Sequence, residues 1–305
     1  MFRHAAFALS LLTACAPATS GGIARQIDVG GRKLYLRCEG SPQPNRPAVI
    51  LIAGYHDSSD PWTEPEALSL LPSAKGPPVL PALARHEYAC AYDRPGTVRY
   101  VAGLPLTRRS TPVAQPRTLR DVARELHALL AAARLPRPYV LVGHSLGGFI
   151  ALFYARSYPS DVSGLVLVDA LSPTLRARLG PLWPQYREVL MHPERQQIPS
   201  MAAKTSELVD IDAGINQMSG APALPRIPLA ILTKTEPFNL PAGMLSPALA
   251  VRIDRAYALA QDDLVRLEPA TPRVFATGSE HYIQLSQPDL VTAVVELVVD
   301  RASAR

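Results

Sequence analysis

The sequence predicts an α/β fold with a mostly parallel central sheet and helices on both faces. Two observations support this prediction: short continuous apolar runs typical of fully buried strands, and amphipathic segments that alternate with them. The 305 residues, 48% hydrophobic and 19% charged, are enough for one large domain or two small ones. Because no internal repeat or linker divides the chain, we expect a single domain over residues 21–305.

The predicted strands follow the apolar runs. Residues 27–38 alternate around Gly30-Gly31, a pattern typical of a two-residue hairpin. The run 47–54 is almost entirely apolar and ends in glycine, as expected of a strand that is buried on both faces. Further strands are expected at 88–93, 139–143, 164–169, 228–233 and 273–277.

The clearest helix is expected over residues 118–135. Thr118 and Asp121 are placed to cap its first turn, and its leucines fall on one apolar stripe. Further helices are expected at 146–158 and at 288–300, the second with proline in its first turn.

Three segments do not fit a plain alternation of strands and helices. Residues 58–81 are rich in proline, serine and leucine, and we expect a long loop or an insertion there, while residues 94–117, rich in proline, arginine and threonine, are expected to be a loop. Residues 171–226 have a mixed helical pattern with many prolines. Since this third segment separates two predicted strands, we expect it to form a helical lid over one end of the sheet.

The first 20 residues are typical of a targeting segment. A short basic start precedes the apolar stretch Ala5–Leu12, which is too short to span a bilayer. Leu12-Thr13-Ala14-Cys15 resembles a bacterial lipobox, in which Cys15 would be lipidated and become the mature N-terminus. We therefore expect a lipoprotein, anchored to a membrane in the periplasm or at the cell surface. The alternative is a secreted soluble protein cut after Ala18.

Cysteine usage agrees with export. Apart from Cys15, only Cys38 and Cys90 are present, an even pair as expected in an oxidising compartment. Each lies in a predicted strand. A disulfide between them and two small buried thiols both remain open at this point.

A candidate nucleophile lies between glycines in the sequence YVLVGHSLGGF. Gly143-His144-Ser145-Leu146-Gly147 follows a predicted strand and opens a predicted helix, the order required for the motif G-x-S-x-G. A sharp turn strains the residue at its apex, so the neighbours two positions away must be small. Ser145 would then project at the helix N-terminus, where free backbone N–H groups favour negative charge.

Ser145 needs a base, and a neutral imidazole is the usual one. Of the seven histidines, His281 is best placed, because it follows the last predicted strand by four residues and precedes the closing helix. His144 lies within the turn itself, where we expect it to support the loop.

These segments together resemble the α/β-hydrolase family of serine hydrolases. The resemblance rests on AGYHDSS, YDRPGT, YVLVGHSLGG, GLVLVDA and SEHYIQLSQPDLV, in the family's order over about five-sixths of the chain. It implies an oxyanion hole made by the backbone N–H groups of Tyr55 and Leu146. One departure is that the family's common His-Gly reads Ala53-Gly54 here.

The family order Ser…Asp/Glu…His leaves two candidates for the acid that orients the histidine. Asp169 ends the strand at 164–169, and Glu236 follows the strand at 228–233. The second strand end is the more frequent position in the family, but the sequence there offers only a glutamate before a proline. We therefore favour Asp169, with Glu236 as the alternative.

The expected activity is hydrolysis of a carboxylic ester of a small-molecule acyl substrate through an acyl-enzyme on Ser145. A thioesterase or an aminopeptidase is an alternative, the latter if Glu207, Asp210 or Asp212 of the lid bound a substrate amine. A hypothesis of another class is a membrane-tethered binding protein that no longer turns over. No cofactor or metal is expected, and a formal charge of +5 without a basic run gives no support for nucleic-acid binding.

Overall fold

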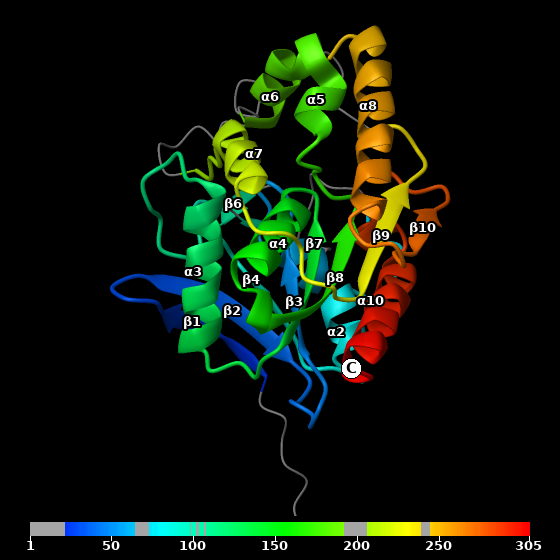
Figure 1. The fold of residues 1–305 in the computed structure, drawn as a ribbon. Coiled ribbons are helices and arrows are strands. Elements are labelled where there is room, and N and C mark those ends of the chain that lie inside the picture. The colour runs from blue at the N-terminus through cyan, green and yellow to red at the C-terminus, as the bar shows by residue number, and fades with distance from the viewer. Residues whose placement is uncertain are drawn as a thin grey trace, which may run out of the picture.

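The structure is a computed structural model that describes residues 22–64, 73–97, 99–101, 104–106, 108–191, 206–238 and 245–305. The expected fold class is confirmed: a mostly parallel eight-stranded sheet lies between helices (Figure 1). The predicted targeting segment, including Cys15 and Ala18, lies outside the described residues. Within those residues no helix is both long enough and apolar enough to cross a bilayer.

The eight strands have the order β1-β2-β4-β3-β7-β8-β9-β10. Strand β2 runs antiparallel to both of its neighbours, β1 and β4, and the six strands β4-β3-β7-β8-β9-β10 are mutually parallel. Their bounds are β1 Ile23–Asp28, β2 Lys33–Glu39, β3 Ala48–Ile52, β4 Ala89–Tyr92, β7 Tyr139–His144, β8 Val162–Val168, β9 Leu229–Lys234 and β10 Arg273–Ala276. Since the central strands are parallel, their carboxyl ends meet at one edge of the sheet.

Helices cover both faces of this sheet. On one face α3 and α4 share a core with the strand side chains, and on the other α2 and α10 do so. The bounds are α2 Val79–Leu83, α3 Leu119–Ala132, α4 Leu146–Ser157 and α10 Pro288–Ser303, with the short α1 Asp60–Thr63 and α9 Ile283–Ser286 nearby. Strands β3, β4 and β7 are buried at every position, which is why their sequences are apolar without alternation.

The expected cap of α3 is confirmed in detail. The Thr118 hydroxyl accepts a hydrogen bond from the Asp121 N–H, and the Asp121 carboxylate accepts one from the Thr118 N–H. This reciprocal arrangement satisfies two N–H groups that a helix start leaves unpaired.

Four helices stand above the carboxyl edge of the sheet, and we call them the cap: α5 Leu175–Leu179, α6 Trp183–Met191, α7 Ile211–Ser219 and α8 Pro247–Val265 (Figure 1). The first three come from the segment expected to be a lid. The fourth follows β9 and packs with α5, where the Arg178 side chain pairs with Asp263 of α8. The cap therefore extends beyond residues 171–226, because the 19-residue helix α8 that follows β9 packs with α5.

Both stretches expected to be loops contain short elements, so those two expectations were wrong in part. α1 lies within residues 58–81 and α2 begins there, and α1 buries Trp62 completely. Residues 94–117 contain a small antiparallel hairpin of β5 Arg99–Val101 and β6 Leu104–Leu106.

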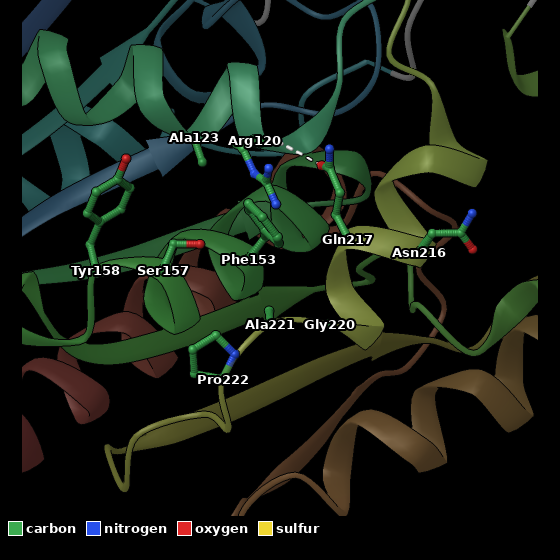
Figure 2. Close-up of a pocket in the computed structure, with 10 residues that line it drawn as sticks. All are labelled: Arg120, Ala123, Phe153, Ser157, Tyr158, Asn216, Gln217, Gly220, Ala221 and Pro222. Carbon is green, nitrogen blue, oxygen red and sulfur yellow. Dashed lines mark hydrogen bonds between the residues drawn. The ribbon is translucent and has the colours of Figure 1, made fainter.

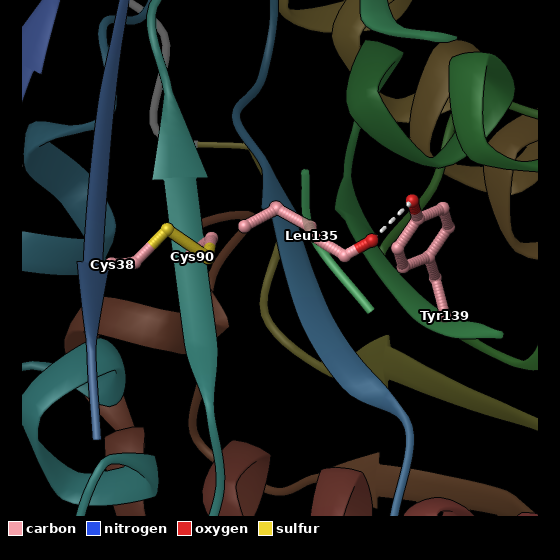
Figure 3. Close-up of a disulfide and its surroundings, with 4 residues drawn as sticks. All are labelled: Cys38, Cys90, Leu135 and Tyr139. Carbon is pink, nitrogen blue, oxygen red and sulfur yellow. Dashed lines mark hydrogen bonds between the residues drawn. A yellow bond between two sulfur atoms is a disulfide. The ribbon is translucent and has the colours of Figure 1, made fainter. Parts of the chain in front are cut away.

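A disulfide joins Cys38 of β2 to Cys90 of β4 (Figure 3). The two cysteines face each other in the antiparallel register of these strands, with Cα atoms 4.0 Å apart. Both are fully buried, so the bond ties the N-terminal hairpin to the parallel part of the sheet from within the core. Of the two alternatives left open by the sequence, the structure has the disulfide.

Candidate active site

Ser145 lies at the carboxyl edge of the sheet, between β7 and α4. Its backbone N–H donates to the Val168 carbonyl of the neighbouring strand at 3.1 Å, and its carbonyl accepts from Leu171 N–H at 2.9 Å. These bonds fix the turn beside Asp169, which directly follows β8.

The turn at Ser145 has the strained geometry expected of a nucleophile elbow. Ser145 adopts φ 52° and ψ −120°, a backbone conformation that residues other than glycine rarely adopt. A Cβ at Gly143 would lie less than 3.0 Å from the backbone of Gly147, and a Cβ at Gly147 would lie as close to the backbone of Ile52. Larger residues at these two positions would therefore open the turn.

Strained backbone is concentrated at this edge. Three of the five non-glycine residues with positive φ among the described residues are His56 after β3, Ser145 after β7 and Asp169 after β8. Such conformations cost of the order of 1–3 kcal/mol each and persist only where the surrounding structure enforces them. Their gathering at adjacent strand ends marks this edge as the candidate site.

His281 and Asp169 are joined although 112 residues separate them in the sequence. His281 Nδ1 lies 2.6 Å from Asp169 Oδ2, and the Asp169 side chain is fully buried. A carboxylate can only accept, so the hydrogen of the neutral imidazole lies on Nδ1. Nε2 is then left as the basic nitrogen.

Glu236, the alternative acid, lies elsewhere. Its residue is exposed, and its carboxylate accepts a hydrogen bond from the hydroxyl of Thr235 at 3.3 Å. The structure thus places Asp169, and not Glu236, against the imidazole.

His144 bonds to the loop that carries His281, a second loop beyond the turn that it was expected to support. Its Nε2 donates to the His281 carbonyl at 3.1 Å, and the two rings lie 4.5 Å apart. Burial, and secondarily the charge of His281, keeps the pKa of His144 well below its usual value. His144 is therefore neutral, and it ties the residue before the nucleophile to the histidine loop.

Tyr257 of α8, which was not predicted from the sequence, also lies beside Ser145, Asp169 and His281. Its hydroxyl donates to the Asp169 carbonyl at 2.6 Å and also interacts with the Ser145 side chain. Its ring meets the His281 ring edge-on at a centroid distance of 6.0 Å. One tyrosine thus contacts all three candidate catalytic residues. Tyr257 was not predicted because α8 itself was not expected, although Ser246 as N-cap followed by Pro247 is a typical helix start.

Further aromatic rings surround the imidazole. Phe238, which follows β9, lies with its ring 5.0 Å from both the His281 and the Tyr257 rings. Tyr186 of α6 also lies near Asp169. Burial raises the pKa of Tyr186, and the charge of the Asp169 carboxylate raises it further. The cap therefore brings aromatic side chains to the candidate site.

The two expected oxyanion donors follow the neighbouring strands β7 and β3. Leu146 is the first residue of α4, and Tyr55 follows Gly54 directly after β3. The Tyr55 side chain is anchored away from its backbone, because its hydroxyl donates to the Val209 carbonyl at 3.0 Å and accepts from the Val209 N–H at 2.7 Å. Gly54 has no room for a side chain, since a Cβ would lie 2.8 Å from His144 Nδ1.

The cap carboxylates considered as an amine-binding group are all engaged. Glu207 forms a buried ion pair with Arg94, and Asp210 caps α7. Asp212 accepts from Trp183 and pairs with two arginines of α5 and α6. None of the three is free to hold a substrate amine in this structure.

Two cavities lie near the cap. The larger, of about 600 Å³, lies among α3, α4, α7 and the turn after α7, and none of its lining residues belongs to the catalytic group (Figure 2). The smaller, of about 140 Å³, lies between the end of β9 and α8 and is lined by Asp169 and Tyr257 among others. Size alone would select the wrong one, because only the smaller touches the residues that could do chemistry. In the described part of the chain, no three His, Cys, Asp or Glu residues gather as a metal site.

The fold and the site define an α/β-fold hydrolase. The model of the alpha/beta hydrolase family matches residues 49–294, and the chain belongs to this family.

Most of the sequence relatives align with less than half of the chain. A protein of Yersinia enterocolitica named "Putative carbamate hydrolase RutD" is 33% identical over 137 residues, 45% of this chain and 41% of that protein. A Schizosaccharomyces pombe protein, "Uncharacterized protein C23C11.06c", is 24% identical over 283 residues, 83% of this chain and 51% of that protein. The chain thus spans about half or less of the length of these curated relatives.

Solved structures resemble the whole chain. A thermophilic esterase from Thermogutta terrifontis has a TM-score of 0.55 at 17% identity, covering 92% of this chain and 99% of that one. The haloalkane dehalogenase DatA from Agrobacterium tumefaciens C58 has a TM-score of 0.55 at 18% identity, covering 92% and 97%. At such identities the likeness concerns the fold alone, and the two different activities illustrate that this fold does not determine the chemistry.

Proposed function

We propose that this protein is a serine hydrolase that cleaves a carboxylic ester through an acyl-enzyme formed on Ser145. The observation that carries the proposal is the 2.6 Å contact between His281 Nδ1 and buried Asp169, beside a serine held in a strained turn. Asp169 would hold the imidazole tautomer and stabilise the imidazolium, while His281 serves as the base.

The reaction would proceed in two halves. Ser145 Oγ attacks the ester carbonyl carbon as its proton moves to His281 Nε2, and the N–H groups of Tyr55 and Leu146 stabilise the oxyanion. The intermediate collapses, and the alcohol leaves with the proton from His281. Water then attacks the acyl-enzyme and gives its proton to His281. The second collapse releases the acid and returns the proton to Ser145.

The substrate we favour is a neutral ester with a small or medium apolar acyl group. Support comes from the aromatic rings of Phe238 and Tyr257 beside His281, since such surfaces bind apolar groups. Aminopeptidase action has less support, because Glu207, Asp210 and Asp212 already have other partners. A thioester remains a candidate because it reacts by the same steps.

We also propose an exported lipoprotein, lipidated at Cys15 and anchored in the periplasm or at the cell surface. The Cys38–Cys90 disulfide supports export, because such bonds persist in oxidising compartments. Mass spectrometry of the mature N-terminus tests this: a diacylglyceryl mass on Cys15 is expected, and an unmodified start after Ala18 would contradict lipidation.

The central test compares the wild type with Ser145→Ala on a panel of short-chain esters, thioesters, aminoacyl amides and carbamates. We expect the highest kcat/KM on an ester, and loss of turnover and of fluorophosphonate labelling in Ser145→Ala at unchanged circular dichroism. Carbamates belong in the panel because a sequence relative is named for them. A wild type that neither labels nor turns over would favour the binding protein, and activity persisting in Ser145→Ala would refute the mechanism.

A further inference from the structure

A buried ion pair links the cap segment to the loop that carries Tyr55. Arg94, shortly after β4, and Glu207, shortly before α7, have side chains that are 0% and 1% exposed. Arg94 Nε lies 2.5 Å from Glu207 Oε1, and Nη2 lies 3.0 Å from Oε2. This is the bidentate geometry in which a planar guanidinium and a carboxylate bind most strongly.

The outer atoms of this pair bond to the backbone on both sides of Tyr55. Arg94 Nη1 donates to the Ala53 carbonyl at 2.8 Å, and Nη2 donates to the Gly54 carbonyl. Glu207 Oε2 accepts from the His56 N–H at 2.7 Å. Three consecutive peptide units of one loop are thus held by two side chains that come from elsewhere in the chain.

The bond to the Gly54 carbonyl bears directly on the proposed oxyanion donor. The Gly54 C=O and the Tyr55 N–H belong to one peptide unit, and in a planar trans peptide they point in opposite directions. Because Arg94 holds the carbonyl on one side, the N–H is aimed to the other side. The bonds to Ala53 and His56 prevent the neighbouring units from turning with it.

Each member of the pair depends on the other. Burial opposes the charge of both groups, yet the Arg94 guanidinium brings the pKa of Glu207 below its usual value, and Glu207 raises the pKa of Arg94. Both are therefore charged at neutral pH. Removing one alone would leave an unpaired charge in the core, which is strongly destabilising.

We infer that Arg94 and Glu207 are positioning residues for the reaction: they aim the Tyr55 N–H at the oxyanion. This inference rests on the proposed hydrolysis at Ser145. It adds that Glu207, which lies between the cap helices α6 and α7, helps to set the geometry of the oxyanion hole. A purely structural pair would support stability without affecting the transition state selectively.

The test uses Arg94→Met/Glu207→Leu, because replacing a buried ion pair by apolar groups of similar volume spares the fold better than removing one partner. We expect kcat on the best ester to fall by about 10- to 100-fold, short of the roughly 100- to 1,000-fold loss on removing a donor. KM should change by less than about threefold. Inhibition by a boronic acid, which mimics the oxyanion, should weaken in step with kcat/KM.

The matched control is Arg117→Met/Glu125→Leu. This buried pair has side chains 7% and 0% exposed and N–O atoms 2.9 Å apart. Glu125 also pairs with Arg32, whose side chain is 39% exposed and can turn to solvent, and the ion pairs of Glu125 in the described part of the chain do not involve residues 53–56. Its kcat should stay within about twofold of the wild type at similar Tm. The comparison removes general effects of deleting a buried pair.

Arg94→Lys gives a second measurement if the double variant fails to fold. Lysine keeps the charge but lacks the planar fork that reaches the Ala53 and Gly54 carbonyls together, so kcat should again fall at nearly constant KM. A folded Arg94→Met/Glu207→Leu, or failing that Arg94→Lys, with kcat within twofold of the wild type would overturn the inference. Wild-type turnover that Ser145→Ala abolishes would then leave the proposed function standing, so the two failures are distinguishable.

Discussion

The ends of β8 and β9 are neighbours at the carboxyl edge of the sheet, yet they present their carboxylates to different surroundings. After β8 the chain turns at Asp169 with φ 41°, and the buried side chain meets His281. After β9 the chain continues to Glu236, which is exposed and bonds to its own neighbour Thr235. A carboxylate at the end of a strand is therefore not enough to orient the histidine. The backbone conformation and the burial of the side chain determine whether the carboxylate contacts it.

The largest effect is expected at the end of β8. Asp169→Asn should lower kcat by about 10⁴-fold at nearly unchanged Tm, because an amide can donate to the imidazole and so favours the wrong tautomer. Steady-state kinetics on a chromogenic ester measures this. A loss of less than about tenfold would mean that another group orients His281.

A third strand end, after β3, carries a carboxyl group that lies near the site without touching His281. The Tyr282 hydroxyl donates to Asp57 at 3.3 Å, and burial raises the pKa of Asp57 to about 7, against the opposing charge of Arg94. Between pH 4 and 7 the unfolded chain therefore gives up this proton while the folded chain keeps it. The free energy of unfolding should fall as the pH rises through this window.

Asp57→Asn should remove this dependence. The difference in free energy of unfolding, variant minus wild type, should therefore increase by about 2–4 kcal/mol between pH 4 and pH 8. One pKa unit corresponds to about 1.4 kcal/mol, and the value is kept low because Asp57 is only partly buried. Urea unfolding at several pH values measures the difference. Parallel pH profiles for the two proteins would show that Asp57 is ionised throughout.

Tyr257→Phe tests what the cap adds to the end of β8. The variant loses the hydrogen bond to the Asp169 carbonyl and the interaction with Ser145, and we expect a cost of about 1–2 kcal/mol in stability. Because Tyr257 lies outside the proposed proton path, kcat should fall by less than about tenfold. A loss of about 1,000-fold at full folding would make the tyrosine hydroxyl a catalytic group.

The smallest effect is expected at the end of β9. Glu236→Gln removes an exposed charge, so kcat and Tm should both stay close to those of the wild type. This variant is the matched control for Asp169→Asn, as both exchange a carboxylate for its amide at a strand end. A loss similar to that of Asp169→Asn would reverse the comparison.

Much of the fold could be predicted from local patterns. The apolar runs gave the central strands within a few residues, and Thr118 with Asp121 gave the start of α3, because burial on both faces and helix capping depend on near neighbours in the chain. α8 and the extent of the cap were missed. Ser246 and Pro247 mark the start of α8, but the position of this helix above the sheet follows from its packing on α5 and β9.

By itself the sequence determined the strands of the main sheet, the glycine-flanked turn at Ser145 and the presence of a histidine before the last helix. Each follows from the conformation that a short stretch can adopt. Only the tertiary structure decided that Asp169 meets His281, that Tyr257 reaches Ser145, and that Arg94 and Glu207 hold the loop of Tyr55. These pairings join residues up to 151 positions apart, and such contacts depend on how the elements pack and not on the sequence near either partner.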